Sequence, residues 1–176
     1  VDELPEARLT AKATNLNSLV QLEKGEEIVA CFDEVKDDTL VFFTALGNAK
    51  RTEGKEFDLR TKKTAAIALK DDDRVIAVEK QNETAGTVIM VSKGGMSIRF
   101  ATDTVPVMGK GAGGVKCMKL DEGDRVIFAA QIADEGEILT ISDRGYAKRS
   151  LVFDYEIQGR NGKGLKTFDF KKNGSN

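Results

Sequence analysis

Histidine and tryptophan are absent from the 176-residue sequence, and tyrosine occurs only twice. Without histidine, the chain lacks the residue that most often serves as a general base or as a metal ligand. The sequence therefore predicts no catalytic site and no metal site of the usual kinds. With so few large aromatic rings, extensive stacking of nucleic-acid bases is not expected either.

Membrane-spanning and disulfide patterns are also missing. No apolar run approaches the roughly 20 residues that cross a bilayer, and the opening residues VDELPEARLT do not form a signal peptide. Cys31 and Cys117 match no zinc or redox spacing, so we expect two small buried thiols in a reducing compartment. A hydrophobic content of 40% and a charged content of 32% are typical of a soluble globular protein without a membrane partner.

Glycine, in contrast, is abundant, and one glycine-rich stretch suggests a nucleotide site. Gly109, Gly111 and Gly114 satisfy the G-x-G-x-x-G spacing that cradles a dinucleotide pyrophosphate. In a dinucleotide-binding fold, this loop is followed by a helix whose N-terminus meets the phosphates. Here residues 115–120, VKCMKL, alternate as a strand does. We therefore expect no cofactor and no small-molecule substrate, and we interpret the loop as a β connection.

The glycine-rich loop belongs to an internal repeat of about 50 residues. Leu22, Leu69, Leu120 and Phe170 occupy equivalent positions, at spacings of 47, 51 and 50 residues. An acidic bend and an apolar strand follow each of the first three. Between these anchors, β-branched runs are broken at a central glycine and continue into a second strand that ends in arginine. The aligned glycines and arginines are Gly47, Gly95 and Gly145 with Arg51, Arg99 and Arg149.

Four strands per repeat of this length predict an all-β, propeller-like fold of four-stranded blades. We expect about three full blades with partial ones at the ends, and the segment 15–22 is assigned to a strand. Neighbouring blades must stack, because a single blade cannot cover both of its faces. The chain is interpreted as one repeat domain, residues 1–176, cut from a larger array. Its approximate units are 1–22, 23–70, 71–121, 122–171 and 172–176.

A run of carboxylates raises the question of a metal site. Asp71, Asp72 and Asp73 do not match a calcium loop. The equivalent stretches 23–26 and 121–124 are also acidic bends between strands. We therefore interpret the run as a turn.

Charge is unevenly distributed along the chain. The net charge of −2 argues mildly against nucleic acid, but residues 144–172 hold eight basic and three acidic side chains, a local charge of +5. Basic residues recur after the central glycine and in the loop of each unit, which would place them on one edge of every blade. Such a strip suits a phosphate backbone, to which affinity comes from counterion release. The alternative interpretation is ordinary solvated surface.

Three stretches of the repeat, residues 7–30, 108–127 and 158–170, resemble the C-terminal domain of bacterial type IIA topoisomerase A subunits. That family covers the A subunits of DNA gyrase and topoisomerase IV, and the resemblance recurs in register through nearly the whole chain. It implies a β-pinwheel, a propeller-like disc whose blades exchange strands and which binds and bends double-stranded DNA along a basic outer rim. The implied partners are DNA, the ATPase B subunit, and the remainder of the A subunit of a cytoplasmic, nucleoid-associated, ATP-dependent enzyme.

The same resemblance points to one loop in particular. The gyrase box of this family reads Gln-Arg-Arg-Gly-Gly-Lys-Gly and supports tight DNA wrapping. Residues 158–164 match it in part: Gly159 stands in place of an arginine and Asn161 in place of a glycine. The box-like residues are Gln158, Gly159, Arg160, Asn161, Gly162, Lys163 and Gly164. The degenerate box favours a topoisomerase IV-like domain that bends DNA without a full wrap.

Phosphate contacts are expected from the basic residues that recur in the repeat and its loops. They are Lys50, Arg51, Lys62, Lys63, Arg99, Lys110, Lys148, Arg149, Arg160, Lys163 and Lys166.

No catalytic residue is expected, since neither Tyr146 nor Tyr155 lies in the context of a DNA-cleaving tyrosine and no phosphate-binding loop for ATP is present. The alternative to DNA binding is a propeller-like module that docks another protein.

Overall fold

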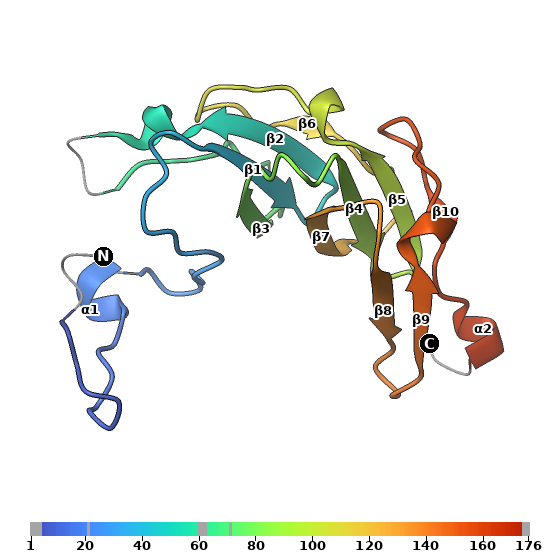
Figure 1. Ribbon diagram of the computed structural model, residues 1–176, viewed down its shortest axis with the longest axis horizontal. Coiled ribbons are helices and arrows are strands. Elements are labelled where there is room, and N and C mark those ends of the chain that lie inside the picture. The colour runs from blue at the N-terminus through green and yellow to red at the C-terminus, as the bar shows by residue number, and fades with distance from the viewer. Residues whose placement is uncertain (1–4, 21, 60–62, 71, 174–176) are drawn as a thin grey trace.

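The computed structural model describes residues 5–20, 22–59, 63–70 and 72–173. The described chain is a β protein in the form of an arch (Figure 1). The N-terminal segment forms one leg of the arch and the hairpin of β8 and β9 forms the other. The strands of the two larger sheets lie in the crown between them.

The first sheet has four antiparallel strands in the order β3-β1-β2-β6. Its centre is the hairpin of β1 (Thr39–Thr44) and β2 (Asn48–Glu53), which turns at Gly47. The strand β3 (Val75–Lys80) pairs with the free edge of β1. The fourth strand, β6 (Val115–Lys116), comes from beyond the next hairpin and pairs with β2.

The second sheet repeats this arrangement, in the order β10-β5-β4-β7. The hairpin of β4 (Thr87–Ser92) and β5 (Met96–Ala101) receives β7 (Val126–Ile132) on one edge. The two-residue strand β10 (Leu165–Lys166) pairs with the other edge. Both sheets therefore take their last strand from beyond the following hairpin. The expected β-pinwheel with exchanged strands is confirmed.

The third hairpin, β8 (Glu137–Ile141) and β9 (Ala147–Leu151), forms a two-stranded sheet within the described residues. The repeat predicts a four-stranded blade here, but neither flanking strand lies beside this hairpin. Short 3-10 turns follow the hairpins: η1 (Gly54–Phe57), η2 (Thr102–Thr104) and η3 (Val152–Asp154). The described residues form two α-helices, α1 (Asn17–Val20) and α2 (Phe170–Asn173), of four residues each.

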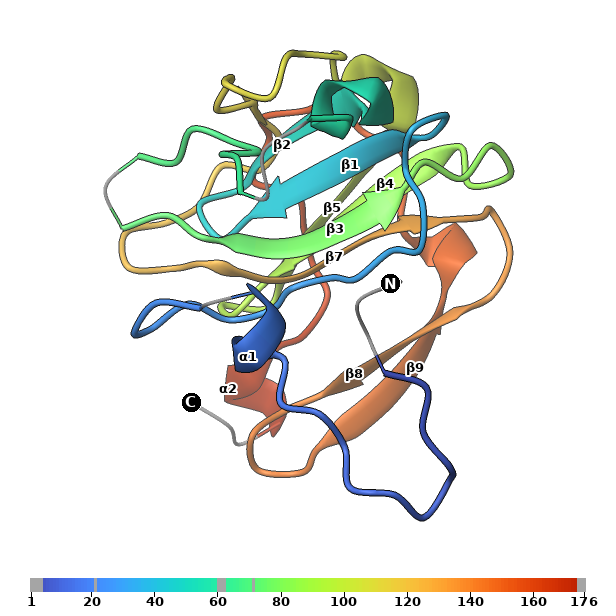
Figure 2. The ribbon, with the colours of Figure 1, turned by 90° about the vertical axis from the view of Figure 1, so that its left-hand side faces the viewer.

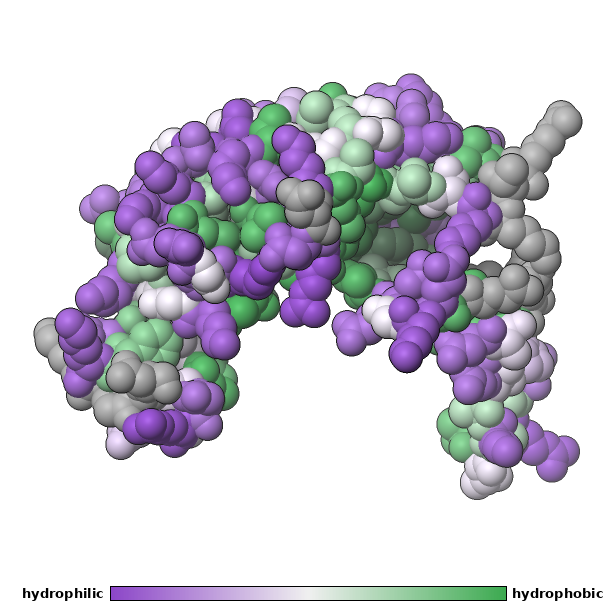
Figure 3. Space-filling model, turned by 180° about the vertical axis from the view of Figure 1, so that it is seen from behind, coloured by the Kyte–Doolittle hydropathy of each residue, from purple (hydrophilic) through white to green (hydrophobic). Residues whose placement is uncertain are grey.

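The hydrophobic core lies between the first two sheets. Val41 and Phe43 of β1 pack with Val88 and Met90 of β4, and Met118, which follows β6, completes the cluster. Strands β3 and β7 lie side by side, since the Gln131 amide donates to the Lys80 carbonyl at 2.9 Å. Figure 2 shows these strands gathered above the N-terminal segment. The hollow underside of the arch also exposes hydrophobic residues (Figure 3).

A glycine carbonyl fastens each exchanged segment to the preceding hairpin. The Gly47 carbonyl accepts hydrogen bonds from the Cys117 and Met118 N–H groups at 2.8 and 3.1 Å. In the next unit the Gly95 carbonyl accepts from Thr167 and Phe168 at the same two distances. Both glycines have φ near +80°, which disfavours any residue with a Cβ.

The acidic bends brace the same turns. The Asp73 carboxylate accepts from the Leu46 N–H at 2.8 Å, and the Asp124 carboxylate accepts from the Gly94 N–H at 2.9 Å. Each carboxylate thus satisfies a backbone donor in the hairpin beside it. Asp73 and Asp124 therefore stabilise turns, as expected from the assignment of the acidic stretches to bends between strands.

Three local expectations for the chain are resolved by the structure. The segment 15–22 is not a strand, because residues 17–20 form α1. The stretch 28–33, equivalent to β3 and β7, pairs with no strand in the described residues, so Cys31 is exposed where a buried thiol is expected. Cys117 is buried, as expected.

We expect Gly47→Ala to destabilise the protein more than Gly145→Ala, by roughly 1–3 kcal/mol. Both glycines have nearly the same φ, +79° and +81°, so the backbone strain of alanine is matched. A Cβ on Gly47 would lie 2.7 Å from the Met118 carbonyl oxygen, whereas a Cβ on Gly145 meets nothing within 4 Å. Urea unfolding followed by circular dichroism measures the difference. Equal losses would show that the exchanged segment is not held tightly at Gly47.

Candidate nucleic-acid interface

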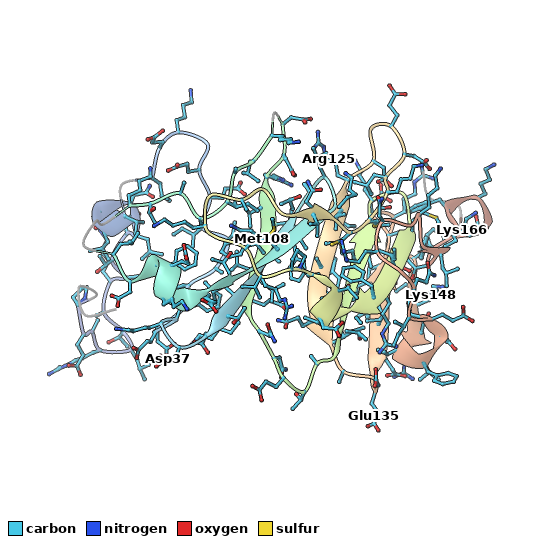
Figure 4. All side chains as sticks on the ribbon, turned by 90° about the horizontal axis from the view of Figure 1, so that it is seen from above. Asp37, Met108, Arg125, Glu135, Lys148 and Lys166 are labelled. Atoms are coloured by element: carbon cyan, nitrogen blue, oxygen red, sulfur yellow. The ribbon has the colours of Figure 1, made fainter. Side chains whose placement is uncertain are left out.

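Two exchanged segments, residues 108–118 and 158–168, run over the outer side of the arch. Figure 4, which looks down on this side, shows Met108 near its centre, with Lys148 and Lys166 both towards one end of the view. Arg125 and Glu135 lie at opposite edges of the same view. We call the surface formed by these two segments the rim. Its basic residues are Lys110, Lys116, Arg160, Lys163 and Lys166.

The loop of residues 158–164 is held against the preceding segment by backbone hydrogen bonds. The Asn161 N–H donates to the Cys117 carbonyl at 2.7 Å, and the Lys119 N–H donates to the Gly162 carbonyl at 2.8 Å. Asn161 has a φ of +67°, a conformation that asparagine tolerates better than most residues. The replacement of the box glycine by Asn161 therefore preserves the left-handed turn.

Arg160 and Lys163 extend from this loop with different partners. The half-buried Arg160 guanidinium donates to the Lys116 carbonyl at 3.4 Å and also interacts with the Cys117 thiol. The exposed Lys163 ammonium lies 2.5 Å from the Asp121 carboxylate. A phosphate that binds Lys163 must therefore compete with Asp121.

Cys117 lies below the same loop. Burial raises the pKa of its thiol to about 11, although the neighbouring Arg160 acts in the opposite direction. The thiol is therefore neutral at physiological pH, and a neutral buried thiol is a poor nucleophile and metal ligand. Its contribution is to packing.

Two of the expected phosphate contacts are instead buried, and Lys50 is the first. Its side chain is 0% exposed, and its ammonium donates to the Gly109 and Lys110 carbonyls at 3.0 Å each. The ammonium also lies 5.3 Å from the centre of the Phe42 ring. Burial lowers the Lys50 pKa to about 8, against the opposing effect of the Glu56 carboxylate. Lys50 therefore contacts the underside of the rim and cannot reach DNA directly.

Arg99 is the second buried cation, at 5% exposed. Its guanidinium donates to the Val152 and Tyr155 carbonyls at 3.4 and 3.3 Å and pairs with Asp134 at 2.5 Å. Arg51 repeats this arrangement one unit earlier, donating to the Val105 carbonyl at 2.6 Å. These arginines join a hairpin to the 3-10 turn of the following unit, so their recurrence in the sequence reflects the fold.

The remaining expected residues lie outside the rim or at its end. Lys148 and Arg149 are exposed on β9, and Arg149 pairs with Glu137 at 3.0 Å. Lys63 pairs with Glu23 and Glu26 in the N-terminal leg. Lys62 falls outside the described residues. Lys166 is on the rim, 3.8 Å from Asp169.

Sequence reasoning missed two rim-side lysines, Lys116 and Lys119. Lys116 is exposed on β6 and donates to the Leu46 carbonyl at 2.7 Å. Lys119 is exposed, and its ammonium has no partner among the described residues. The repeat register could have found the first, because Lys116 occupies in β6 the position of Lys166 in β10.

The two tyrosines lie in different surroundings. The Tyr155 hydroxyl is buried against Thr167 Oγ1 at 2.7 Å, and Tyr146 is exposed in the β8–β9 turn. The described residues include no cluster of carboxylates, cysteines or histidines able to hold a metal ion. Nor do they include a helix long and apolar enough to cross a membrane. A row of spaced cations on a curved edge is suited to binding a polyanion.

Fold and rim together define a class: a pinwheel of strand-exchanging repeat units with a basic outer edge. A family model described as "DNA gyrase C-terminal domain, beta-propeller" matches residues 38–82, 86–133 and 136–176. The chain belongs to this family.

Relatives agree with the assignment. The A subunit of DNA gyrase from Haloquadratum walsbyi is 34% identical over 184 residues, covering 99% of this chain and 21% of the relative. Its counterpart from Escherichia coli is 36% identical over 171 residues, covering 94% and 19%. The chain thus spans about a fifth of the length of these relatives.

Among solved structures, the C-terminal domain of DNA topoisomerase IV superposes with a TM-score of 0.87 at 26% identity, covering 94% of this chain and 53% of that one. The E. coli ParC C-terminal domain shares the fold, with a TM-score of 0.72 at 15% identity, over 89% of this chain and 66% of that one.

The buried Lys50 predicts a pH-dependent stability. Because its pKa is about 8 in the folded protein against 10.5 when unperturbed, the folded chain binds fewer protons than the unfolded chain between these values. The free energy of unfolding should therefore rise with pH across this window, by up to about 1.4 kcal/mol per pH unit from this residue. Denaturant unfolding of the wild type and of Lys50→Met at pH 7, 9 and 10 isolates the contribution. An identical pH dependence in both proteins would contradict it.

Proposed function

We propose that this chain is a DNA-binding and DNA-bending element of a type IIA topoisomerase A subunit. The observation that supports it best is the placement of Arg160, Lys163, Lys116 and Lys119 around one rim loop. The loop is the degenerate gyrase box, and hydrogen bonds fix it to the preceding unit. Membership of the gyrase C-terminal family supports the same function.

Binding along the rim would depend on the phosphate backbone. Lysine and arginine side chains contact phosphates without reading base edges, so no sequence preference is expected. A duplex that follows the curved outer side of the arch must bend, at a cost of order 1–6 kcal/mol for 20–30 base pairs. Cations along both exchanged segments would offset that cost.

The rim favours bending over tight wrapping. Glycine replaces one arginine of the box at position 159, and the Lys163 ammonium is already paired with the Asp121 carboxylate. Lys50 and Arg99 are unavailable because they are buried. We infer a weak bender that helps an ATP-dependent topoisomerase to select its DNA segment. In this proposal its partners are DNA and the rest of the A subunit, the ATPase B subunit belongs to the same enzyme, and the setting is the bacterial nucleoid.

A double substitution of Arg160 and Lys163 by alanine tests the DNA contact. We expect weaker binding to any duplex sequence and a log K against log salt slope that is shallower by about 1.8, or 0.9 for each lost phosphate contact. Fluorescence anisotropy with two unrelated duplexes at several salt concentrations measures both quantities. Lys12 and Lys24, exposed in the N-terminal leg, provide the charge-matched control when changed together to alanine.

Three outcomes of this experiment would contradict the proposal. An unchanged slope in the Arg160 and Lys163 variant would make these residues ordinary surface charges. Equal losses in the variant and the control would show that net charge matters rather than the rim. If the wild-type chain fails to bind DNA at low salt, the protein-docking alternative is favoured.

Asp121→Asn should strengthen DNA binding. The substitution keeps the size of the side chain but removes the charge that faces Lys163 at 2.5 Å. Because an exposed ion pair contributes only about 0–1 kcal/mol to stability, the fold should tolerate the change. We expect a steeper salt slope, by up to about 0.9, and higher affinity in the same anisotropy assay. The double variant that also changes Lys163 to alanine should lose the gain, and a gain that persists would place its origin elsewhere.

A further inference from the structure

Lys50 is the most deeply buried cation that the proposed function leaves without a role. Its ammonium lies under the loop of residues 108–114, the first rim loop, where it is hydrogen-bonded to two successive carbonyls. Hydrogen bonds from a charged donor are stronger than neutral ones. The loop is therefore fixed from beneath at Gly109 and Lys110.

The direction of these two carbonyls determines the direction of two N–H groups. In a planar trans peptide, the C=O and N–H bonds point to opposite sides. Since the Gly109 and Lys110 carbonyls face Lys50, the N–H groups of Lys110 and Gly111 face away from it. Neither N–H has a hydrogen-bond partner within the part of the chain that the structure describes. Gly111 is exposed, and a Cβ there would meet nothing within 4 Å.

We propose that Lys50 is the positioning residue of the first rim loop, holding it so that the N–H groups of Lys110 and Gly111 donate to DNA phosphates. This inference rests on the proposed function, because it specifies how one rim loop would contact the DNA backbone. Backbone N–H groups in glycine-rich turns bind phosphate well, since no side chain obstructs the approach. Gly109 and Gly111 provide that access on either side of Lys110.

The second rim loop, residues 158–164, provides an internal comparison. Ile98 occupies in β5 the position that Lys50 occupies in β2, directly before the recurring arginine of each hairpin. The Ile98 Cδ1 atom lies 3.4 Å from the position that a Cβ would take on Gly162 of this loop. An apolar side chain therefore suffices as packing beneath a rim loop. The charge of Lys50 must serve another purpose.

The charge of Lys50 is also the feature that titrates. The groups that face its ammonium are the Phe42 ring from β1, the Glu56 carboxylate from η1 and the Lys110 main chain from the loop. Burial lowers the Lys50 pKa to about 8, and Glu56 partly offsets this. Above that pH the neutral Lys50 amine makes weaker hydrogen bonds to the two carbonyls, and there is no longer a positive charge beneath the loop.

DNA affinity of the full chain, measured by anisotropy from pH 7 to 9.5 at constant salt, tests the proposal. We expect wild-type affinity to fall about three- to tenfold with a midpoint near pH 8. Lys50→Met should bind more weakly at pH 7 and show a flat profile. Lys110→Met, which removes a rim charge but keeps Lys50, should retain the wild-type pH profile. Other groups that titrate in this range are common to all three proteins.

A second measurement needs only the wild type, and so covers the case in which Lys50→Met fails to fold. In amide NMR spectra at pH 6.5, the wild-type Lys110 and Gly111 resonances should shift on addition of a short duplex. Where Lys50→Met does fold, these two resonances should not respond in the variant, while the Asn161 and Gly162 resonances still do. A wild-type affinity that is constant from pH 7 to 9.5, or unresponsive Lys110 and Gly111 amides in a wild type that binds DNA, would overturn the inference alone. Failure of the wild type to bind DNA would overturn the proposed function with it.

Discussion

The structure depends on one constraint: the last strand of each of the two larger sheets must come from beyond the next hairpin. The Gly47 carbonyl receives two N–H groups from residues 117 and 118, and the Gly95 carbonyl receives two from residues 167 and 168. These contacts place β6 beside β2 and β10 beside β5, while β3 and β7 cover the other edges of the two hairpins. The β8–β9 hairpin has neither kind of neighbour within the described residues. Leu139 of β8 is therefore 63% exposed, while its equivalent Ile89, which pairs with Ala130 of β7, is 0% exposed. The segments that complete the two larger sheets also carry the rim.

The same exchange explains why cations recur through the repeat. Arg51 and Arg99 donate to carbonyls of the following unit, so they contribute to the joint between units. Lys110, Arg160 and Lys163 lie on the exchanged segments, so the joint also determines where they face. Burying Arg99 requires partners for its charge, and the two carbonyls and Asp134 supply them. One repeat therefore carries both structural and surface cations.

Much of the fold can be predicted because it repeats. The anchors at Leu69 and Leu120 and the turn glycines predict the hairpins in register, and the glycine-rich loop is a β connection, as its flanking strand pattern indicates. The assignment of 15–22 to a strand is wrong, because strand formation there requires a neighbouring sheet edge that local sequence does not reveal. The expected burial of Cys31 is wrong for the same reason: the apolar run of residues 28–32 resembles β3 but has no partner strand in the described residues.

The candidate site is harder to predict, because equivalent positions differ in burial. Lys50, Ile98 and Lys148 share one position of the repeat, yet the first is buried under a rim loop and the last is exposed. The following unit determines whether a lysine at this position is buried or exposed. Lys50, for example, donates to the carbonyl of Lys110, which lies 60 residues later in the sequence. The place of Lys116 on the rim can be predicted, because it aligns with Lys166 in the repeat. The ion pair between Lys163 and Asp121 cannot be predicted from the repeat.

The two rim loops obtain positive charge in different ways. The first has a buried ammonium beneath it and glycines on either side of Lys110, so its backbone is accessible and its charge is internal. The second rests on Ile98 and carries Arg160 and Lys163 on the loop itself, with Asp121 opposing one of them. A charge held beneath the loop is shielded from solvent ions and is screened less by salt than an exposed one. Salt should therefore weaken phosphate binding more strongly at the second loop, while a rise in pH should weaken it at the first.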